Sequence, residues 1–132
     1  MPTPIGQCGR YLWSADIEPA EWIHPDDYAD FTAQHSLGRI YHCQGETPPY
    51  IAIQANRRQA FRVNPEGFSP VPDTPYYIGD SVRIQVGSQA GAEAEIVSMG
   101  WHTNKQKILF GLAVNGKRRS RQYWEEDIAP VA

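Results

Sequence analysis

The chain has 132 residues, of which 41% are hydrophobic and 20% charged, and its formal net charge is −3. This length and composition fit one domain or two small ones with a hydrophobic core, and they exclude wholesale disorder. Because the chain holds 11 glycines and 11 prolines, it turns often and long helices are not expected.

The N-terminal residues, MPTPIGQCGRYLW, lack the basic start and the apolar run of a secretory signal. No stretch approaches the roughly 18 apolar residues of a membrane span. We therefore expect a cytoplasmic protein that does not contact a membrane. In that compartment Cys8 and Cys43 are expected to be reduced, buried thiols, whereas export by another route would allow them to form one disulfide.

Helix signals are concentrated in the stretch HPDDYADFTAQHSLG. Pro25 suits the first position of a helix, and the two acidic residues after it complement the N-terminal dipole. Tyr28, Phe31 and His35 would share one face of a short helix, and Gly38 could end it.

Short strands are expected at residues 39–43, 50–55 and 60–63, because these are rich in β-branched and aromatic residues and are separated by turn sequences. Together they predict an antiparallel meander. Residues 64–75, NPEGFSPVPDTP, then interrupt the pattern with four prolines. This stretch is either a semi-rigid connector or an ordered loop across one core.

After the prolines the strand pattern becomes more regular, through IGDSVRIQV, EAEIVSMGW, ILFGLAV and RRSRQYW. The pair Asn115-Gly116 predicts a type I′ hairpin, in which both central residues need positive φ. Gly111 inside a strand predicts a bulge or a close backbone approach, and Asp80 is expected to cap a turn. Four or five strands with tight turns in about sixty residues predict a small SH3-like barrel.

The predicted fold class is therefore mostly β, with a minor α+β character. Residues 1–72 are expected to form a subdomain with a short helix and a three-stranded antiparallel meander. Residues 73–132 are expected to form a second subdomain, the SH3-like small barrel.

Residues 76–128 also resemble known proteins, the small SH3-like and KOW-like barrels of bacteria. The shared features are the Gly79-Asp80 opening, Trp101-His102 after the second strand, the Val-Asn-Gly-Lys hairpin, and a basic strand that closes on Tyr-Trp-Glu-Glu-Asp. The stretch is more closely similar to a poorly characterised bacterial family whose members are often encoded near secreted toxins. This resemblance implies an immunity or inhibitor-like role, with a cognate toxin or effector domain as the partner.

Two groups of residues are the candidates for contact with a protein partner. One loop offers aromatic anchors, and the acidic helix could present a polyanion-like surface to a basic cleft. Each group also has a purely structural explanation. The tryptophan of the loop could close the end of the barrel, and the acidic side chains could simply form the solvated face of the helix. The candidates are Trp101, His102 and Lys105 on the loop, and Asp26, Asp27 and Asp30 on the helix.

The main alternative is an RNA- or DNA-binding protein that uses the basic strand near the C-terminus. Its residues would be Lys117, Arg118, Arg119, Arg121 and Tyr123. We expect instead that the adjacent acids, residues 125–127, pair with the arginines, at about 0–1 kcal/mol per exposed pair. Neither half of the chain has a basic excess, because residues 1–72 hold eight acids and five bases and residues 73–132 hold seven of each. A protein partner is therefore favoured over nucleic acid.

No catalytic or metal-binding motif is recognisable. The four histidines are scattered, and the sequence lacks C-x₂-C, H-x₃-H, G-x-S-x-G and phosphate-loop patterns. His42 and Cys43 would point to opposite faces of a strand, so they could not easily share a metal. A small enzyme with Cys43 as nucleophile is a third hypothesis, less favoured than Cys43 in the core. We therefore expect a non-catalytic protein without a cofactor or a metal.

Overall fold

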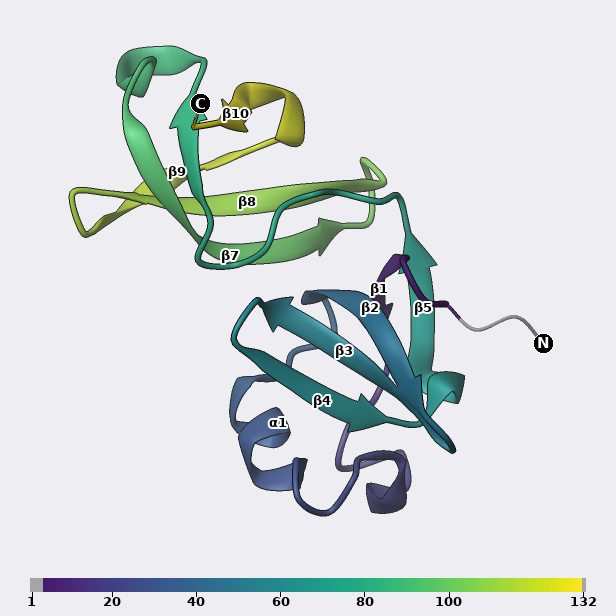
Figure 1. The fold of residues 1–132 in the computed structure, drawn as a ribbon. Coiled ribbons are helices and arrows are strands. Elements are labelled where there is room, and N and C mark those ends of the chain that lie inside the picture. Colours follow the sequence, from purple (N-terminus) through teal and green to yellow (C-terminus); the bar gives the residue numbers. More distant parts are fainter. Residues whose placement is uncertain (1–3, 132) are drawn as a thin grey trace. The chain divides into compact units, whose positions relative to one another are not determined.

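The structure is a computed structural model that describes residues 4–131 (Figure 1). The chain divides into two compact units between Asp73 and Thr74. Each unit contains one five-stranded antiparallel sheet. The protein is therefore mostly β, as the sequence predicts.

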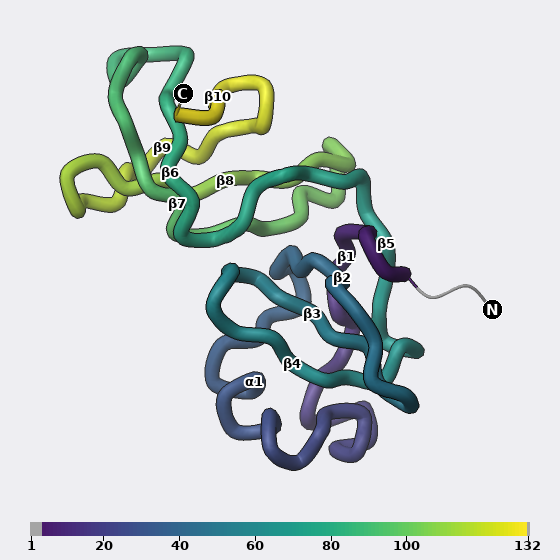
Figure 2. The backbone as a smooth tube through the Cα atoms, in the orientation of Figure 1, coloured from purple at the N-terminus to yellow at the C-terminus, as the bar shows by residue number. Residues whose placement is uncertain are grey.

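The first unit contains the sheet β4-β3-β2-β1-β5. Its strands are β1 (Cys8–Tyr11), β2 (Ile40–Thr47), β3 (Tyr50–Asn56), β4 (Gln59–Val63) and β5 (Phe68–Val71). Its helices are α1 (Tyr28–Gln34) and the one-turn 3₁₀ helices η1 (Ala20–Trp22) and η2 (Pro65–Gly67). Figure 2 shows the chain leaving β1, passing through α1 and returning as β2.

The predicted meander is confirmed as β2-β3-β4, but the sheet has two more strands. β5 lies inside the proline-rich segment 64–75, which is therefore neither a connector nor a loop over its whole length. Pro70 is tolerated because β5 is an edge strand and needs no inward N–H at that position. Pro70 pairs with Gly9 of β1, where an added Cβ would lie 2.6 Å from Phe68 Cζ. The close approach of β1 and β5 thus requires a glycine.

The predicted helix is present but shorter than expected. It begins at Tyr28 after the cap residue Asp27, so Pro25 lies in the preceding turn and not at the first helical position. It ends at Gln34 because His35 adopts an extended conformation, three residues before Gly38. The apolar face is confirmed: Phe31 is fully buried and stacks on His35, with ring centroids 4.5 Å apart.

The second unit contains the sheet β10-β6-β7-β8-β9. Its strands are β6 (Ser81–Ile84), β7 (Glu93–His102), β8 (Lys107–Val114), β9 (Lys117–Tyr123) and β10 (Ile128–Pro130), with the 3₁₀ turns η3 (Gly87–Gln89) and η4 (Glu125–Asp127). The pairings leave β10 and β9 at the two ends of the sheet, so across residues 4–131 the ladder does not close into the expected barrel.

Three local predictions for this unit are confirmed. Asn115 and Gly116 have φ angles of 52° and 78°, as a type I′ turn requires. The Asp80 carboxylate accepts a hydrogen bond from the Tyr77 N–H at 3.0 Å and so caps a turn. Gly111 lies beside register shifts in β7 and β8, and an added Cβ there would meet Ser98 Oγ.

The two units share one connectivity. In both, four strands follow each other as a meander, a one-turn 3₁₀ helix comes next, and the fifth strand pairs with the first. The register shift between the second and third strands falls at corresponding positions, between Cys43 and Gly45 and between Ile96 and Ser98. The pairing registers align five core positions, each at most 2% exposed: Tyr11 with Ile84, Cys43 with Ile96, Ile51 with Phe110, Ile53 with Leu112, and Val63 with Tyr123. We refer to the units as two repeats.

The repeats differ most in the connection between their first two strands. In the first repeat this connection, residues 12–39, contains η1 and α1, whereas residues 85–92 of the second contain only η3. Part of the longer connection returns to the sheet, because Ile23 forms an antiparallel bridge with Val63. The edge of β4 is therefore covered locally by an extended segment of the same chain.

Candidate binding surface

A half-buried tryptophan, Trp124, marks the candidate surface of the second repeat. It follows β9 directly and caps η4. The Asp127 carboxylate accepts a hydrogen bond from the Trp124 N–H at 3.0 Å, and the Asp127 N–H donates to the Trp124 carbonyl at 3.0 Å. These two bonds fix the backbone that carries the indole.

Two polar side chains lie against the indole, and a third binds one of them. The His102 ring meets it edge-on, with centroids 5.5 Å apart, and Lys107 Nζ lies 5.4 Å from the ring centroid. Lys107 Nζ also donates to Glu126 Oε1 at 2.8 Å, and this bond lowers the pKa of Glu126. We call Trp124, His102, Lys107 and Glu126 the aromatic platform. Because its members restrain one another, little side-chain entropy remains to be lost on binding.

Of the three loop residues predicted to contact a partner, only His102 lies in the aromatic platform. Lys105 is exposed, and its backbone N–H donates to His102 Nδ1 at 3.1 Å, so the loop orients the imidazole. Trp101 is half-buried and, as the neighbour of His102 in β7, points to the opposite face of the strand. Trp124 is not among the residues predicted to contact a protein partner, although an acid three residues downstream is a signal for a capped turn.

The basic side chains of β9 do not pair with the acids that follow them. Within residues 4–131, no ion pair is formed by Lys117, Arg118, Arg119 or Arg121. The expected neutralisation is therefore wrong: Glu126 pairs with Lys107, and Asp127 caps the Trp124 N–H. The cause is geometric, because η4 places the carboxylates of Glu126 and Asp127 against Lys107 and the Trp124 N–H. Four cations consequently remain uncompensated along β9.

The β9 side chains make other contacts instead. Arg118 donates to Ser98 Oγ at 3.2 Å, and the Arg121 guanidinium lies 5.0 Å from the centroid of the Tyr123 ring. Tyr123, which the nucleic-acid alternative uses as a stacking surface, is only 2% exposed. Its ring belongs to the core and offers no face to a base.

The acidic residues of the helix bind the rest of the first repeat to different extents. Asp27 receives three hydrogen bonds from Arg62, from its backbone N–H at 2.8 Å, from Nε at 2.9 Å and from Nη2 at 3.1 Å. The side-chain hydrogen bond from Arg62 is the main cause of the lowered pKa of Asp27. Asp30 accepts one bond from Gln59 at 3.2 Å, whereas Asp26 is largely exposed. Asp27 thus fastens the start of α1 to β4, and Asp26 faces the solvent.

Both cysteines are buried, as the sequence predicts, and both are free thiols. Burial raises the pKa of the Cys43 thiol, which disfavours the reactive thiolate. His42 approaches Cys8 instead, with Sγ and Nδ1 3.4 Å apart. This pair is not evident from sequence because β1 and β2 must first align. Cys8 is 1% exposed, so its sulfur is out of reach of a substrate.

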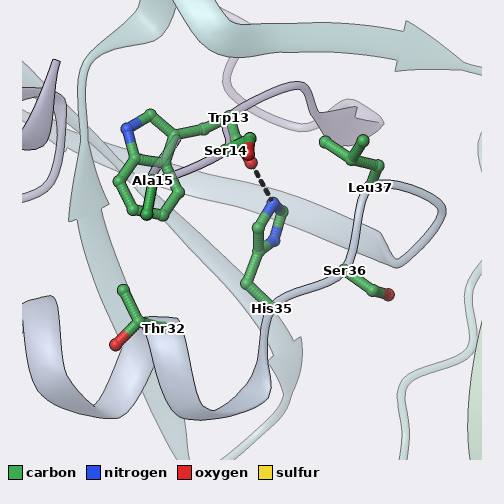
Figure 3. A pocket seen from close by; sticks show the side chains of 7 residues that line it. All are labelled: Trp13, Ser14, Ala15, Thr32, His35, Ser36 and Leu37. Atoms are coloured by element: carbon green, nitrogen blue, oxygen red, sulfur yellow. Dashed lines mark hydrogen bonds between the residues drawn. The ribbon is translucent and has the colours of Figure 1, made fainter. Parts of the chain in front are cut away.

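The first repeat also has a pocket of about 240 Å³ between the start of the β1–β2 connection and the end of α1 (Figure 3). Its lining residues are Trp13, Ser14, Ala15, Thr32, His35, Ser36 and Leu37. The His35 ring nitrogens are both engaged, Nε2 with the Trp13 carbonyl at 3.0 Å and Nδ1 with the Tyr41 hydroxyl at 2.8 Å. Burial lowers the pKa of His35, and the hydrogen bond to the Trp13 carbonyl only partly opposes this effect. The ring therefore supports the fold and presents no free nitrogen to a ligand.

In the part of the chain that the structure describes, no three His, Cys, Asp or Glu side chains are close enough to hold a metal ion. Over the same residues, no helix has the length and apolar character needed to cross a membrane.

Comparison with other proteins gives one result. No curated protein and no solved structure matches the chain. A family model described as a family of unknown function, DUF6960, matches residues 1–129. The match covers both repeats and is much longer than the resemblance over residues 76–128. The chain therefore belongs to the DUF6960 family.

Proposed function

We propose that the protein is a non-catalytic binding protein that occludes a protein partner, and that the aromatic platform contacts this partner. One observation carries the proposal: Trp124 is half-buried and its indole contacts both His102 and Lys107. A restrained tryptophan with an adjacent cation is the type of residue that dominates binding energy in protein interfaces.

The SH3-like fold is part of the proposal. A four-stranded meander, a one-turn 3₁₀ helix and a fifth strand paired with the first support an SH3-like topology for the second repeat, and equally for the first. Folds of this type serve many functions, so the fold alone does not indicate the partner.

The finer form of the proposal is an immunity protein that acts in the cytoplasm against a cognate toxin or effector domain. Its support is the sequence resemblance of residues 76–128 and the exposed acidic side chains at the start of α1. Of these, Asp26 and Asp30 remain the better candidates for contact, because Asp27 is occupied by Arg62.

The test is affinity capture from the source organism, with quantitative identification of what each variant retains. Trp124→Leu keeps an apolar side chain but removes the indole, and it should reduce capture of the specific partner at least about tenfold. The matched control is Trp22→Leu, which changes a half-buried tryptophan of the first repeat. If Trp124→Leu retains the partner as well as the unchanged protein does, the platform is not the binding surface.

Nucleic acid is the second candidate partner, because the four cations of β9 lack acidic partners within residues 4–131. A salt titration separates the two candidates. Phosphate binding would lose affinity steeply, with a slope of about −0.7 per contacted phosphate for a single strand. Binding through the aromatic platform should weaken only gently as salt increases.

A further inference from the structure

We propose that the edge of β9 around Gln122 binds an extended acidic peptide segment of the partner by strand addition. The first repeat already contains this arrangement within one chain, because residues 22–24 lie against the edge of β4. Since this inference rests on the proposed protein-binding function, its test must separate a wrong edge from a wrong function.

The intramolecular arrangement is defined by backbone hydrogen bonds around Val63. The His24 N–H donates to the Arg62 carbonyl at 2.9 Å, and the Asn64 N–H donates to the Trp22 carbonyl at 2.6 Å. Between them Ile23, which is 1% exposed, bridges Val63. The third outward group, the Arg62 N–H, donates to the carboxylate of Asp27 at 2.8 Å. Residues 22–27 thus satisfy this part of the edge with an extended segment and a following aspartate.

The pairing registers identify the matching position in the second repeat. Ile51 pairs with Val63 as Phe110 pairs with Tyr123, and both pairs are followed by a one-turn 3₁₀ helix. One residue earlier, Ala52 pairs with Arg62 as Gly111 pairs with Gln122. Gln122 is therefore the counterpart of Arg62.

The counterpart edge has no covering segment. Gln122 is exposed and lies on the edge strand β9, and within residues 4–131 no segment outside the sheet bonds its backbone N–H or carbonyl. The Trp124 N–H donates to the Asp127 side chain and is therefore not free for an added strand. The first repeat has no such side chain, because Gly67 stands at the position of Asp127. The backbone N–H and carbonyl of Arg62 point outward from β4, so the corresponding groups of Gln122 offer a donor and an acceptor to an added strand. Figure 1 shows the β8–β9 turn extending away from the other strands of this unit.

The charges on β9 indicate which peptide would fit. In the first repeat the added strand continues into Asp26 and Asp27, and Asp27 pairs with Arg62. In the second repeat the edge strand carries four cations without an acidic partner in the described part of the chain. A peptide with an apolar residue followed by aspartates would satisfy the edge and the cations together. Trp124 of the aromatic platform directly follows the proposed edge, so both surfaces could serve one partner.

The probe is a synthetic peptide with the chain's own sequence from residues 19–30, PAEWIHPDDYAD, titrated into the isotope-labelled full-length protein. We expect chemical-shift changes and slower amide exchange centred on Gln122. A peptide N-methylated at the position of His24 lacks the donor for the Gln122 carbonyl, and it should bind at least about fivefold more weakly. This comparison requires no change in the protein.

Two protein variants test the edge from the other side. Gln122→Pro removes the outward N–H, which edge strands tolerate, and Arg118→Glu reverses one charge on β9. Both should weaken the peptide at least about fivefold, whereas Arg58→Glu, in the β3–β4 turn of the first repeat, should not. Circular dichroism establishes that each variant is folded.

Three outcomes would overturn the inference. The peptide could fail to bind, it could shift residues elsewhere in the protein, or a single-stranded oligonucleotide could displace it from β9 at lower concentration. If the peptide fails while Trp124→Leu still abolishes capture of a protein partner, the edge is wrong and the proposed function stands. If neither the peptide nor Trp124→Leu has an effect, both are wrong.

Discussion

At the scale of single residues, the first repeat depends on a few polar side chains that connect the long β1–β2 connection to the sheet. Asp27 is the N-cap residue of α1, but its side chain does not bond the helix. It accepts three hydrogen bonds from Arg62 of β4 instead. His35, just after the helix, binds the Trp13 carbonyl and the Tyr41 hydroxyl. These residues hold both ends of α1, so their protonation states connect the stability of the first repeat to pH.

Asp27→Asn should destabilise the protein mainly at pH values where the carboxylate is ionised. Arg62 lowers the pKa of Asp27 in the folded state below its ordinary value of 3.8. This stabilisation is fully present above pH 3.8 and is lost as pH falls through the lower, folded-state pKa. The free energy of unfolding, measured with denaturant, should therefore fall less steeply with decreasing pH for Asp27→Asn than for Asp30→Asn. The second variant leaves the pair of Asp27 with Arg62 intact. An equally steep fall in the two variants would contradict the assigned role of Asp27.

His35 should make the protein less stable in mild acid. Burial is the main cause of its lowered pKa, and Arg39 contributes in the same direction. Above the ordinary value of 6.5 the ring is neutral in both the folded and the unfolded chain. As pH falls below 6.5 only the unfolded chain gains the proton, so the free energy of unfolding decreases until the folded-state pKa is reached.

The variant His35→Gln should lose this part of the pH dependence, since the glutamine amide does not titrate. Its unfolding free energy should therefore change less between about pH 7.5 and pH 5.5 than that of the unchanged protein. His24→Gln, at a less buried histidine of the same connection, is the control. An NMR titration of the His35 ring with a midpoint above 6.5 would contradict the assigned burial effect.

At the scale of elements, each repeat has a glycine at the register shift between its second and third strands, but the glycine lies on the second strand in one repeat and on the third in the other. At the register shift the first repeat pairs Gly45 with Ala52, whereas the second pairs Ser98 with Gly111. In the second repeat a Cβ on Gly111 would meet Ser98 Oγ and lie 3.2 Å from Arg118 Nη2. The serine side chain therefore occupies the space that an alanine would need.

Gly111→Ala should destabilise the second repeat by about 1–3 kcal/mol through overpacking. The double variant Ser98→Gly/Gly111→Ala recreates the pair found in the first repeat and should recover most of the loss. Gly45→Ala is the control, because its added Cβ would meet no atom within 4 Å. The measurement is the denaturant midpoint of each variant. A double variant no more stable than Gly111→Ala would argue against the correspondence of the two pairs.

The elements also show which features the sequence can predict. The Asn115-Gly116 turn, the apolar face of α1 and the meander follow from local patterns, and they are confirmed. β1 and β5 escaped prediction because β1 holds a glycine and β5 a proline, and both are strands through long-range pairing, β1 with β2 and β5 with β1. The contacts of Trp124 with Lys107 and His102 could not be predicted either, because they form only after β7, β8 and β9 align.

At the scale of the whole molecule, the chain is two repeats of one topology, the first enlarged by a helical connection. One sequence signal of this repeat exists: residues 64–71, NPEGFSPV, and 124–131, WEEDIAPV, each place a short turn before a strand and end in Pro-Val. β5 ends at Val71, whereas β10 ends at Pro130, directly before Val131. The signal is weak, because buried positions such as Val63 and Tyr123 correspond in register but differ in residue type. The two strand orders, in contrast, are the same in both units.

Each repeat should fold as an isolated fragment, because each has its own complete sheet and its own buried core. We expect residues 1–73 and 74–132, expressed separately, to give dispersed NMR spectra in which most resonances overlie those of the full chain. The second fragment should be the less stable, since a domain of about 60 residues buries only about 60% of its unfolded surface. In this fragment the connection between the first two strands, residues 85–92, also contains no helix comparable to α1. A fragment 74–132 that stays unfolded alone, yet folds when 1–73 is added, would show instead that the repeats fold as one unit.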